Sequence, residues 1–361
     1  MADPVVSNID RLRIRVGADW PALRKAREDT FVRLNELKQL FRNRHVPDTG
    51  LVVFGSVARF EVTSSSDLDW ILLLDGSALP EHKEQERDIE LELAEMARKW
   101  YIKPGKSGVF GRMVASHDLV HNIGGESDSN SNTTRRILLL LESTPIGNAE
   151  AYGRVRRQIL RRYLEDDRGL LHASGPVRIP RFLLNDLTRY WRTITVDFVY
   201  KQRADNDNKW ALRNAKLRMS RKLIFAAGLL NCFFCHLDSD AGSARDALKS
   251  GTGDISLLTA YLDRQLAQPP LEVIAKACVE LEIAEETIRN IFDSYDGFLA
   301  LLDDPEKRDA LELVRTHQDL RTSSVWEEVR KLSQPFHEGL ISLFLKDDKH
   351  LSELTMEYGI F

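Results

Sequence analysis

Hydrophobic residues recur at helical spacing near the N-terminus and then give way to short apolar runs. In residues 8–44, apolar side chains return every three or four positions, which predicts helix, and Pro21 is expected to open a second helix there. Two apolar runs follow at 51–54 and 68–74, and runs of this length beside Gly and Ser are typical of buried strands. Residues 80–100 begin with proline, are rich in Glu, Leu and Ala, and predict another helix.

The remaining pattern is mostly helical. Residues 105–116 are expected to form a further strand pair or hairpin, and the Gly-, Ser- and Asn-rich stretch 122–132 is expected to be a loop. From residue 133 onward, helical segments are separated by Pro, Gly or paired Asp residues. The expected helices are 133–143, 149–165, 180–203, 208–237, 254–266, 271–283, 285–303, 306–317 and 323–347.

This order of elements predicts an α+β protein with two domains. The N-terminal domain is expected over residues 1–150, with the strands and the N-terminal helical segment, and an all-helical C-terminal domain over residues 151–361. The boundary is expected near 145–175. The length of 361 residues independently favours two domains.

Composition and charge narrow the class of protein. Hydrophobic residues make up 43% and charged residues 29%, no segment is apolar enough to span a bilayer, and the N-terminus lacks a signal-peptide pattern. Three cysteines are too few for a disulfide scaffold, so a soluble, cytoplasmic protein with no membrane partner is expected. Cys232 and Cys235 form a CxxC inside an apolar run and are interpreted as packing residues. A net charge of −4 argues against a protein whose main task is to coat nucleic acid.

The segment from Phe54 to Trp70 carries the clearest chemical signal. A strand ends in Gly55-Ser56, where the missing side chain lets backbone N–H groups approach an anion and the hydroxyl adds a donor. Asp67 and Asp69 then open the next strand two residues apart, so the alternation of a strand sends both carboxylates to one face. Such a pair can hold hard cations such as Mg²⁺ (or Mn²⁺) for phosphoryl transfer. The alternative is an acidic strand end that merely meets water after a serine turn.

This segment resembles the signature of the DNA polymerase β-like nucleotidyltransferases, a Gly-Ser followed by a DxD. The details around Arg59, Glu61, Thr63 and Ser66-Asp67-x-Asp69 are most similar to the minimal and GlnD-like bacterial branches. The resemblance covers about twenty residues directly and, through the order of elements, roughly residues 45–145. Those branches commonly have Gly where this chain has Phe60.

The resemblance implies a nucleotide site and a third metal-binding acid. Gly55, Ser56, Arg59 and Ser66 are the expected nucleotide-binding residues at the motif, with Gly55 and Ser56 on the β- and γ-phosphates. For the third acid, which can also take the proton from the attacking hydroxyl, Asp118 is preferred because it follows an apolar run. Asp128, Glu126 and Glu142 stay open as alternatives.

Two further segments are candidates for phosphate binding. Arg135 or Arg136, after the loop that begins at Gly124, are candidate phosphate ligands, although a surface loop followed by a helix cap explains the same residues. In the helical part, Lys216 and Lys222 are expected to contact the nucleotide, together with nearby arginines. The alternative for this basic helix is salt bridging to acids such as Asp186 and Asp197.

The expected function is magnesium-dependent transfer of a nucleoside monophosphate from an NTP, with ATP as the expected nucleotide, to an acceptor with release of pyrophosphate. Asp67, Asp69 and Asp118 are the expected metal-binding and catalytic residues. A protein or an RNA is preferred as acceptor, with a small molecule or a second nucleotide as alternatives. The competing hypothesis is a regulatory module that keeps the fold and binds a nucleotide or a partner without catalysis.

Overall fold

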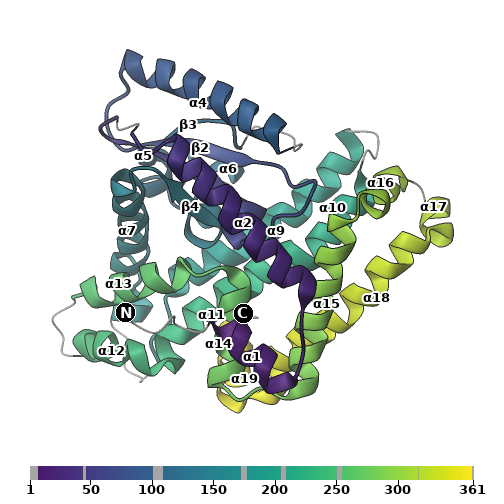
Figure 1. Cartoon of the computed structure of the whole chain (residues 1–361). Helices are drawn as coiled ribbons and strands as arrows, with labels where there is room; N and C mark the ends of the chain where they lie inside the picture. Colours follow the sequence, from purple (N-terminus) through teal and green to yellow (C-terminus); the bar gives the residue numbers. More distant parts are fainter. Residues whose placement is uncertain are drawn as a thin grey trace, which may run out of the picture. The chain divides into compact units, whose positions relative to one another are not determined.

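The computed structural model describes residues 7–43, 46–100, 109–171, 177–204, 209–249, 254–315 and 317–359. Within these ranges the chain is mixed α+β and mostly helical, with one four-stranded sheet (Figure 1). The coarse prediction of an α+β fold is therefore confirmed.

The N-terminal elements follow the sequence pattern closely. Helix α1 (Asn8–Val16) begins after Ser7, whose side chain accepts a hydrogen bond from the Asp10 N–H, and ends at a left-handed glycine. Helix α2 (Pro21–Leu40) begins at the proline, as predicted. Strands β1 (Thr49–Phe54) and β2 (Asp69–Leu74) and helix α4 (Pro80–Lys99) follow.

The sheet is mixed, with the strand order β3-β2-β1-β4. Strand β1 is antiparallel to both of its neighbours, β2 and β4 (Ser143–Ile146). Strand β3 (Arg112–Ala115) runs parallel to β2. Because β4 contains Pro145, which cannot donate a ladder hydrogen bond, its place at the edge of the sheet is physically favoured.

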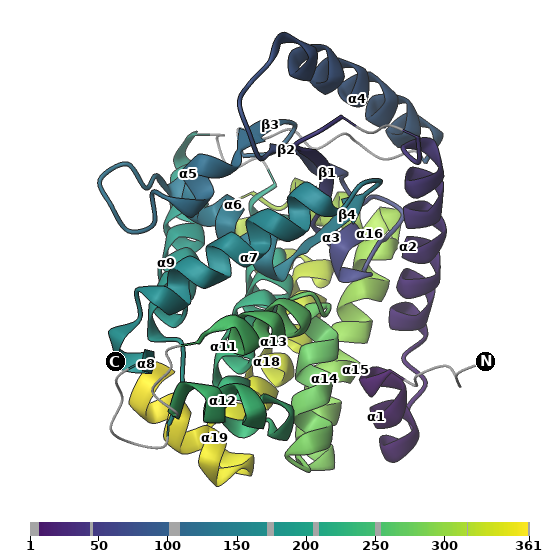
Figure 2. The same cartoon turned by 90° about the vertical axis from the view of Figure 1, so that its left-hand side faces the viewer.

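Alternation along the strands divides the sheet into two faces. On one face, Val53, Trp70 and Leu72 join a buried cluster with apolar residues of α2 and α4. On the other face lie Phe54 and Ile71, and the helices α6 (Asn130–Leu141) and α7 (Glu150–Glu165) contact this part of the sheet. Figure 2 shows α4 on one side of the sheet and α6 and α7 on the other. The sheet is therefore a middle layer.

The structure differs from the sequence pattern around residues 105–146. The expected hairpin falls partly on residues 101–108, outside the described residues, and the described part holds the single strand β3. Helix α6 begins three residues earlier than expected, at Asn130, because Ser129 caps it. Strand β4 was not predicted, since four residues carry too little pattern to separate a strand from a helix end.

The remaining segments are helical, as predicted. They are α8 (Arg168–Leu171), α9 (Arg181–Ala204), α10 (Trp210–Lys216), the π-helical turn η1 (Leu217–Arg221), α11 (Lys222–Leu237), α12 (Gly242–Lys249), α13 (Ser256–Leu266), α14 (Pro270–Glu280), α15 (Glu285–Asp303), α16 (Pro305–Leu313), α17 (His317–Thr322), α18 (Ser324–Ser342) and α19 (Lys349–Leu354). Of these, α8, α12 and α19 were not predicted. Within α11, Cys232 and Cys235 are buried free thiols, which agrees with their interpretation as packing residues.

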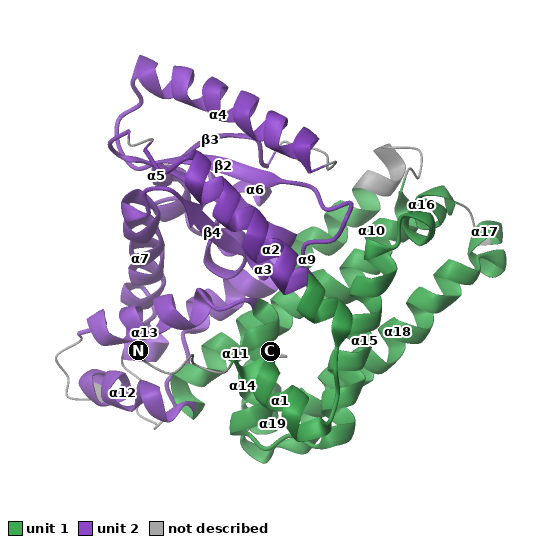
Figure 3. Ribbon diagram, viewed as in Figure 1, with its two compact units in different colours: residues 1–25, 191–237, 270–361 green, residues 26–190, 238–269 purple. Residues whose placement is uncertain are grey.

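The chain divides into two compact units, each made of segments that are separated in the sequence (Figure 3). Unit 1 comprises residues 1–25, 191–237 and 270–361, and unit 2 comprises residues 26–190 and 238–269. The segment 238–269 joins the sheet-containing unit because α13 packs against α7.

In the described part of the chain, no single helix is long and apolar enough to cross a membrane. One pair of helices that is bent at a break, Trp210–Leu237 with Ser239–Leu248, passes the same length and composition test together.

Candidate active site

The candidate site lies where β1 ends beside the start of β2, in unit 2. The register pairs Phe54, the last residue of β1, with Asp69, the first residue of β2. The chain then turns at Gly55, with φ +70° and ψ −145°, into the short helix α3 (Ser56–Arg59). A Cβ on Gly55 would lie 3.4 Å from Oδ2 of Asp69. Glycine is thus placed where the backbone conformation is unfavourable for other residues and where a carboxylate lies close.

Asp67 lies two residues before Asp69, the first residue of β2. Leu68, which lies between them, is buried in the core cluster that also contains Trp70 and Leu72. The side chains at 67 and 69 therefore belong to the opposite face, with Cα atoms about 6–7 Å apart along the chain. Asp67 is exposed and Asp69 is half-buried. Among the described residues, no hydrogen bond or ion pair engages the Asp67 carboxylate, so it is available to a cation.

The turn after Gly55 contains a left-handed residue. The carbonyl of Ser56 accepts a hydrogen bond from the Glu61 N–H at 2.8 Å and closes the turn. Phe60, inside this turn, has φ +60° and ψ 41°. Glycine adopts this conformation without steric cost, whereas other residues lose about 1–2 kcal/mol. The chain thus keeps the backbone shape that glycine favours, although it carries Phe at this position.

Arg59 has a different place from the one predicted for a phosphate ligand. Its side chain is buried, and it forms ion pairs with two buried carboxylates: Nε lies 2.6 Å from Glu61 and Nη1 lies 2.5 Å from Glu142. Glu142 directly precedes β4. The Arg59 cluster (Arg59, Glu61 and Glu142) therefore connects α3 to the neighbouring edge of the sheet. Its guanidinium stabilises the turn and does not face solvent.

Ser66 is also a structural residue of the turn before the aspartates. It is buried, and its Oγ accepts a hydrogen bond from the Thr63 N–H at 2.9 Å. Its own N–H donates to the Thr63 carbonyl at 3.1 Å. These bonds hold the approach to Asp67 and leave Ser66 turned inward, in contrast to the predicted contact with nucleotide.

Asp118, the preferred third acid, lies away from the aspartate pair. Strand β3 is parallel to β2, and its last residue, Ala115, pairs with Leu74, the last residue of β2. Asp118 follows in α5 (Ser116–Val120), so it lies beyond the end of β2 that is opposite to Asp69. Five residue steps along a strand correspond to about 16 Å. The parallel pairing therefore places the residues that follow β3 away from Asp69.

Glu142 is the alternative acid that the sheet places near Asp69, next to the end of β1. Ser143, its neighbour in the chain, pairs with Phe54, and Phe54 pairs with Asp69 on its other side. The three strand positions therefore lie in one row. Glu142 is buried and engaged by Arg59, as described above. Glu126, the other acid considered, is an exposed loop residue.

Asp128 and Arg136 belong to a buried network inside unit 2. Arg136 is fully buried, and its Nη2 lies 2.9 Å from Asp128 and 2.7 Å from Asp186. Tyr163 donates a hydrogen bond to Asp186, and Arg189 forms an ion pair with Asp128 at 2.6 Å. Arg136 is thus not a solvent-facing phosphate ligand, and Asp128 is not a metal-binding acid. Asp186 has its partners in this network rather than in the basic helix.

The electrostatics of this network follow from burial and pairing. Burial raises the pKa of the Asp128 carboxyl, but the hydrogen bonds from Arg136 and the Gly124 N–H outweigh it, so the pKa lies below its usual value. Burial lowers the pKa of Arg136, and its two carboxylate partners more than reverse that effect. Burial and the neighbouring Asp186 raise the pKa of Tyr163 well above its usual value. Asp128 is thus held deprotonated, Arg136 positively charged and Tyr163 neutral at neutral pH.

The other basic candidates also have defined surroundings. The Arg135 Nε donates to the carbonyl of Val109 at 2.8 Å, and burial lowers its pKa. Lys216 and Lys222 belong to unit 1, whereas the aspartate pair belongs to unit 2, so their contact with a nucleotide stays a prediction. Burial, followed by the charge of Arg218, lowers the pKa of Lys222.

Comparison of the chain with protein-family models, with curated proteins and with solved structures gives no match.

Proposed function

We propose that the protein is a divalent-metal-dependent nucleotidyltransferase that moves a nucleoside monophosphate from an NTP to an acceptor hydroxyl. The observation that carries this proposal is the edge of the sheet where Gly55 lies against Asp69, with Asp67 expected on the same face by strand alternation. A glycine turn beside a carboxylate pair at the start of a buried strand suits a metal-bound triphosphate.

The residues of this edge fit a metal ion. Asp67 is exposed and has no other partner among the described residues, and both carboxylates supply the hard oxygen ligands that Mg²⁺ prefers. When bound there, the ion would neutralise charge on the triphosphate and act as a Lewis acid. Gly55 keeps the space next to Asp69 open, which a larger residue would narrow.

The reaction balances as an in-line displacement. The acceptor oxygen forms a bond to the α-phosphorus, the bond from the α-phosphorus to the oxygen bridging toward the β-phosphorus breaks, and the acceptor proton is released. The backbone N–H groups after Gly55 and the Ser56 hydroxyl would donate hydrogen bonds to the departing pyrophosphate. Asp67 and Asp69 would hold the charge-neutralising ion, and the Arg59 cluster would keep α3 in position.

The acceptor class is a separate part of the proposal. A protein or an RNA is preferred, on the resemblance of the Gly-Ser and DxD motif to the minimal and GlnD-like branches. The chemistry at the sheet edge is the same for any acceptor with a hydroxyl group. The test therefore has to offer both classes.

The experiment measures pyrophosphate release from each of the four NTPs with Mg²⁺ or Mn²⁺, with total RNA, a protein lysate or no acceptor. We expect release with at least one combination, and we expect Asp69→Asn to abolish it, because this change removes a metal-binding charge without altering side-chain volume. Asp88→Asn, the same chemical change at an exposed position of α4, is the matched control and should retain the activity.

Two outcomes contradict the proposal. Equal release by the wild type and Asp69→Asn would place the activity elsewhere. Metal-dependent NTP binding without turnover for every nucleotide and acceptor would favour the regulatory module instead.

A further inference from the structure

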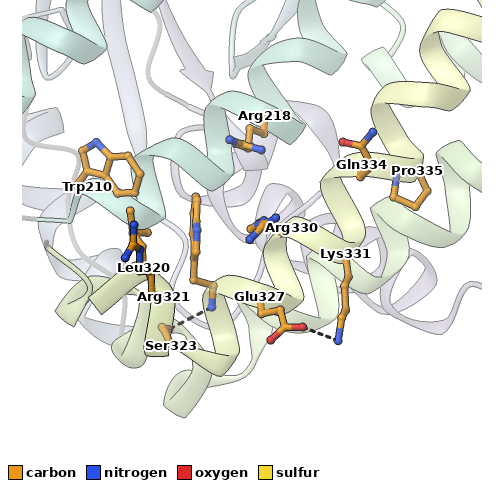
Figure 4. Close-up of a pocket in the computed structure, with 11 residues that line it drawn as sticks. Trp210, Arg218, Leu320, Arg321, Ser323, Glu327, Arg330, Lys331, Gln334 and Pro335 are labelled. Atoms are coloured by element: carbon orange, nitrogen blue, oxygen red, sulfur yellow. Dashed lines mark hydrogen bonds and ion pairs between the residues drawn. The ribbon is translucent and has the colours of Figure 1, made fainter. Parts of the chain in front are cut away.

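A pocket of about 950 Å³ lies within unit 1, between the helices α10 and α18 (Figure 4). The residues that line it are Trp210, Arg218, Leu320, Arg321, Ser323, Trp326, Glu327, Arg330, Lys331, Gln334 and Pro335. We call it the tryptophan–arginine pocket. Its volume lies at the upper end of the range for ligand pockets, about 300–1,000 Å³.

Two indole rings form the aromatic part of this pocket. The ring centroids of Trp210 and Trp326 are 5.4 Å apart, and the ring planes are inclined by 51°. Phe198 supports Trp210 from a second direction, with centroids 6.2 Å apart. Trp326 is buried in the floor, whereas Trp210 is only half-buried. The pocket therefore presents a supported aromatic surface, and aromatic surfaces of this kind stack on nucleobases.

The cationic part of the pocket consists of three arginines and a lysine. The Arg218 guanidinium lies 5.7 Å from the centroid of the Trp326 ring. Figure 4 shows Arg218 and Arg330 extending from different helices toward the same central space. Glu327 is the single carboxylate among the lining residues, and it forms an ion pair with Lys331 at 3.0 Å.

The arginines lack the partners that structural arginines have elsewhere in this chain. In the described residues, no carboxylate lies within ion-pairing distance of Arg218, Arg321 or Arg330, and the side chain of Arg218 donates to the amide oxygen of Asn214. By contrast, Arg136 is satisfied by two carboxylates. The lining thus carries four cationic side chains against the single carboxylate of Glu327, and an anionic ligand would lower the remaining repulsion between the cations.

We propose that the tryptophan–arginine pocket binds single-stranded nucleic acid, with a base stacked on Trp210 and the adjacent phosphates on Arg218, Arg321 and Arg330. Its lining on α18 extends from Trp326 to Pro335, about 14 Å of helix. Stacked nucleotides are spaced about 3.4 Å apart along a strand, so this length accommodates several of them. Arginine also stacks on bases and contacts phosphates, which lysine does less well. This inference goes beyond the proposed function and does not require turnover.

The test measures anisotropy of a fluorescein-labelled single-stranded 12-mer of RNA, and of the same sequence in DNA, with the full chain and no divalent metal. Arg330→Ala and Arg321→Ala remove exposed side chains without ion-pair partners, so both variants should fold. We expect each to weaken binding several-fold, and we expect the double variant to show a smaller dependence of affinity on salt. Arg11→Ala, an exposed arginine of α1 outside the pocket, is the control of equal charge and should change little.

Trp210→Leu tests the stacking part separately. We expect a loss of affinity of about 5- to 150-fold, the range for one stacked base, with the salt dependence unchanged. Its melting temperature is recorded alongside, because Trp210 is half-buried; the arginine variants keep the test decisive if this variant is unstable.

Competition identifies the source of the ligand. Displacement of the oligonucleotide by a high excess of a mononucleotide such as AMP would support recognition of one base and its phosphate. Tighter binding of the oligonucleotide than of AMP would support contact with several nucleotides along the pocket. The proposal is overturned if the wild type does not bind either strand at 50 mM salt, if the double arginine variant binds as tightly as the wild type, or if poly-glutamate competes as well as the oligonucleotide.

Discussion

Gly55 lies directly against Asp69: a Cβ built on the glycine would come within 3.4 Å of the carboxylate oxygen Oδ2. The glycine also has φ +70° and ψ −145°, a conformation that L-residues rarely adopt. The turn proposed to bind phosphate and the strand proposed to hold the metal are therefore coupled through one position. A change at Gly55 acts on both.

Gly55→Ala should weaken NTP binding and lower stability together. The strained backbone costs about 1–3 kcal/mol, and relief of that strain would move the turn away from Asp69. Isothermal titration calorimetry with Mg²⁺ and NTP and a thermal melt measure the two effects. Gly125→Ala is the control, because nothing lies within 4 Å of a Cβ there. An unchanged affinity of Gly55→Ala for NTP would show that this turn does not bind the nucleotide.

Phe60 provides a test of the left-handed turn. Phe60→Gly loses part of the packing against the core cluster, but it removes a backbone cost of about 1–2 kcal/mol. Phe60→Val retains more apolar surface, yet a β-branched residue is the least suited to this conformation. We therefore expect Phe60→Gly to be the more stable of the two variants in urea unfolding. The reverse order would contradict a left-handed Phe60.

Asp118→Asn should leave turnover within about twofold of the wild type, as for most exposed substitutions. The parallel pairing of β2 and β3 puts Asp118 beyond the end of the strand opposite to Asp69. Steady-state pyrophosphate release, measured in parallel with Asp69→Asn, compares the two aspartates directly. A loss in Asp118→Asn as large as that in Asp69→Asn would restore Asp118 as a third acid.

Arg136→Met should destabilise unit 2 strongly. Removal of the guanidinium leaves Asp128 and Asp186 buried without their shared cation, and breaking a buried pair in this way costs about 3–5 kcal/mol. Arg161→Met is the matched control on an exposed helix face: its pair with Glu165 contributes about 0.3–0.5 kcal/mol. Chemical denaturation measures both. Equal and small losses of stability in Arg136→Met and Arg161→Met would show that the buried network contributes little to the free energy of unfolding.

The same network predicts how stability depends on pH. The pKa of Asp128 is lower in the folded chain than its ordinary value of 3.8, so the folded state holds the deprotonated form more strongly. The contribution of the Asp128 carboxylate to the free energy of unfolding is fully present above the pKa of the unfolded chain, about 3.9. It is lost as the pH falls through the pKa of the folded chain. When urea unfolding is measured at a series of pH values, the midpoints of the wild type and Asp128→Asn should differ by a constant amount from pH 5 to 7. The difference should shrink below about pH 4, and a constant difference down to pH 3 would contradict the assignment.

Local features of the site were predictable from the sequence because their geometry depends on neighbours along the chain. The common face of Asp67 and Asp69 follows from strand alternation, and the position of Gly55 follows from the end of an apolar run. The helices were predictable for the same reason, since a period of 3.6 residues is a property of one segment.

Strand neighbours, strand direction and ion-pair partners were decided by the tertiary structure alone. Whether β3 runs parallel to β2 depends on the path of the chain between them, and this direction removes Asp118 from the site. Arg136 and Asp186 are separated by fifty residues, so nothing in the local pattern of either indicates the other. The sequence by itself determined the carboxylate pair and the glycine turn, because each is set by residues that are adjacent in the chain; which other charges reach them was decided by packing between distant segments.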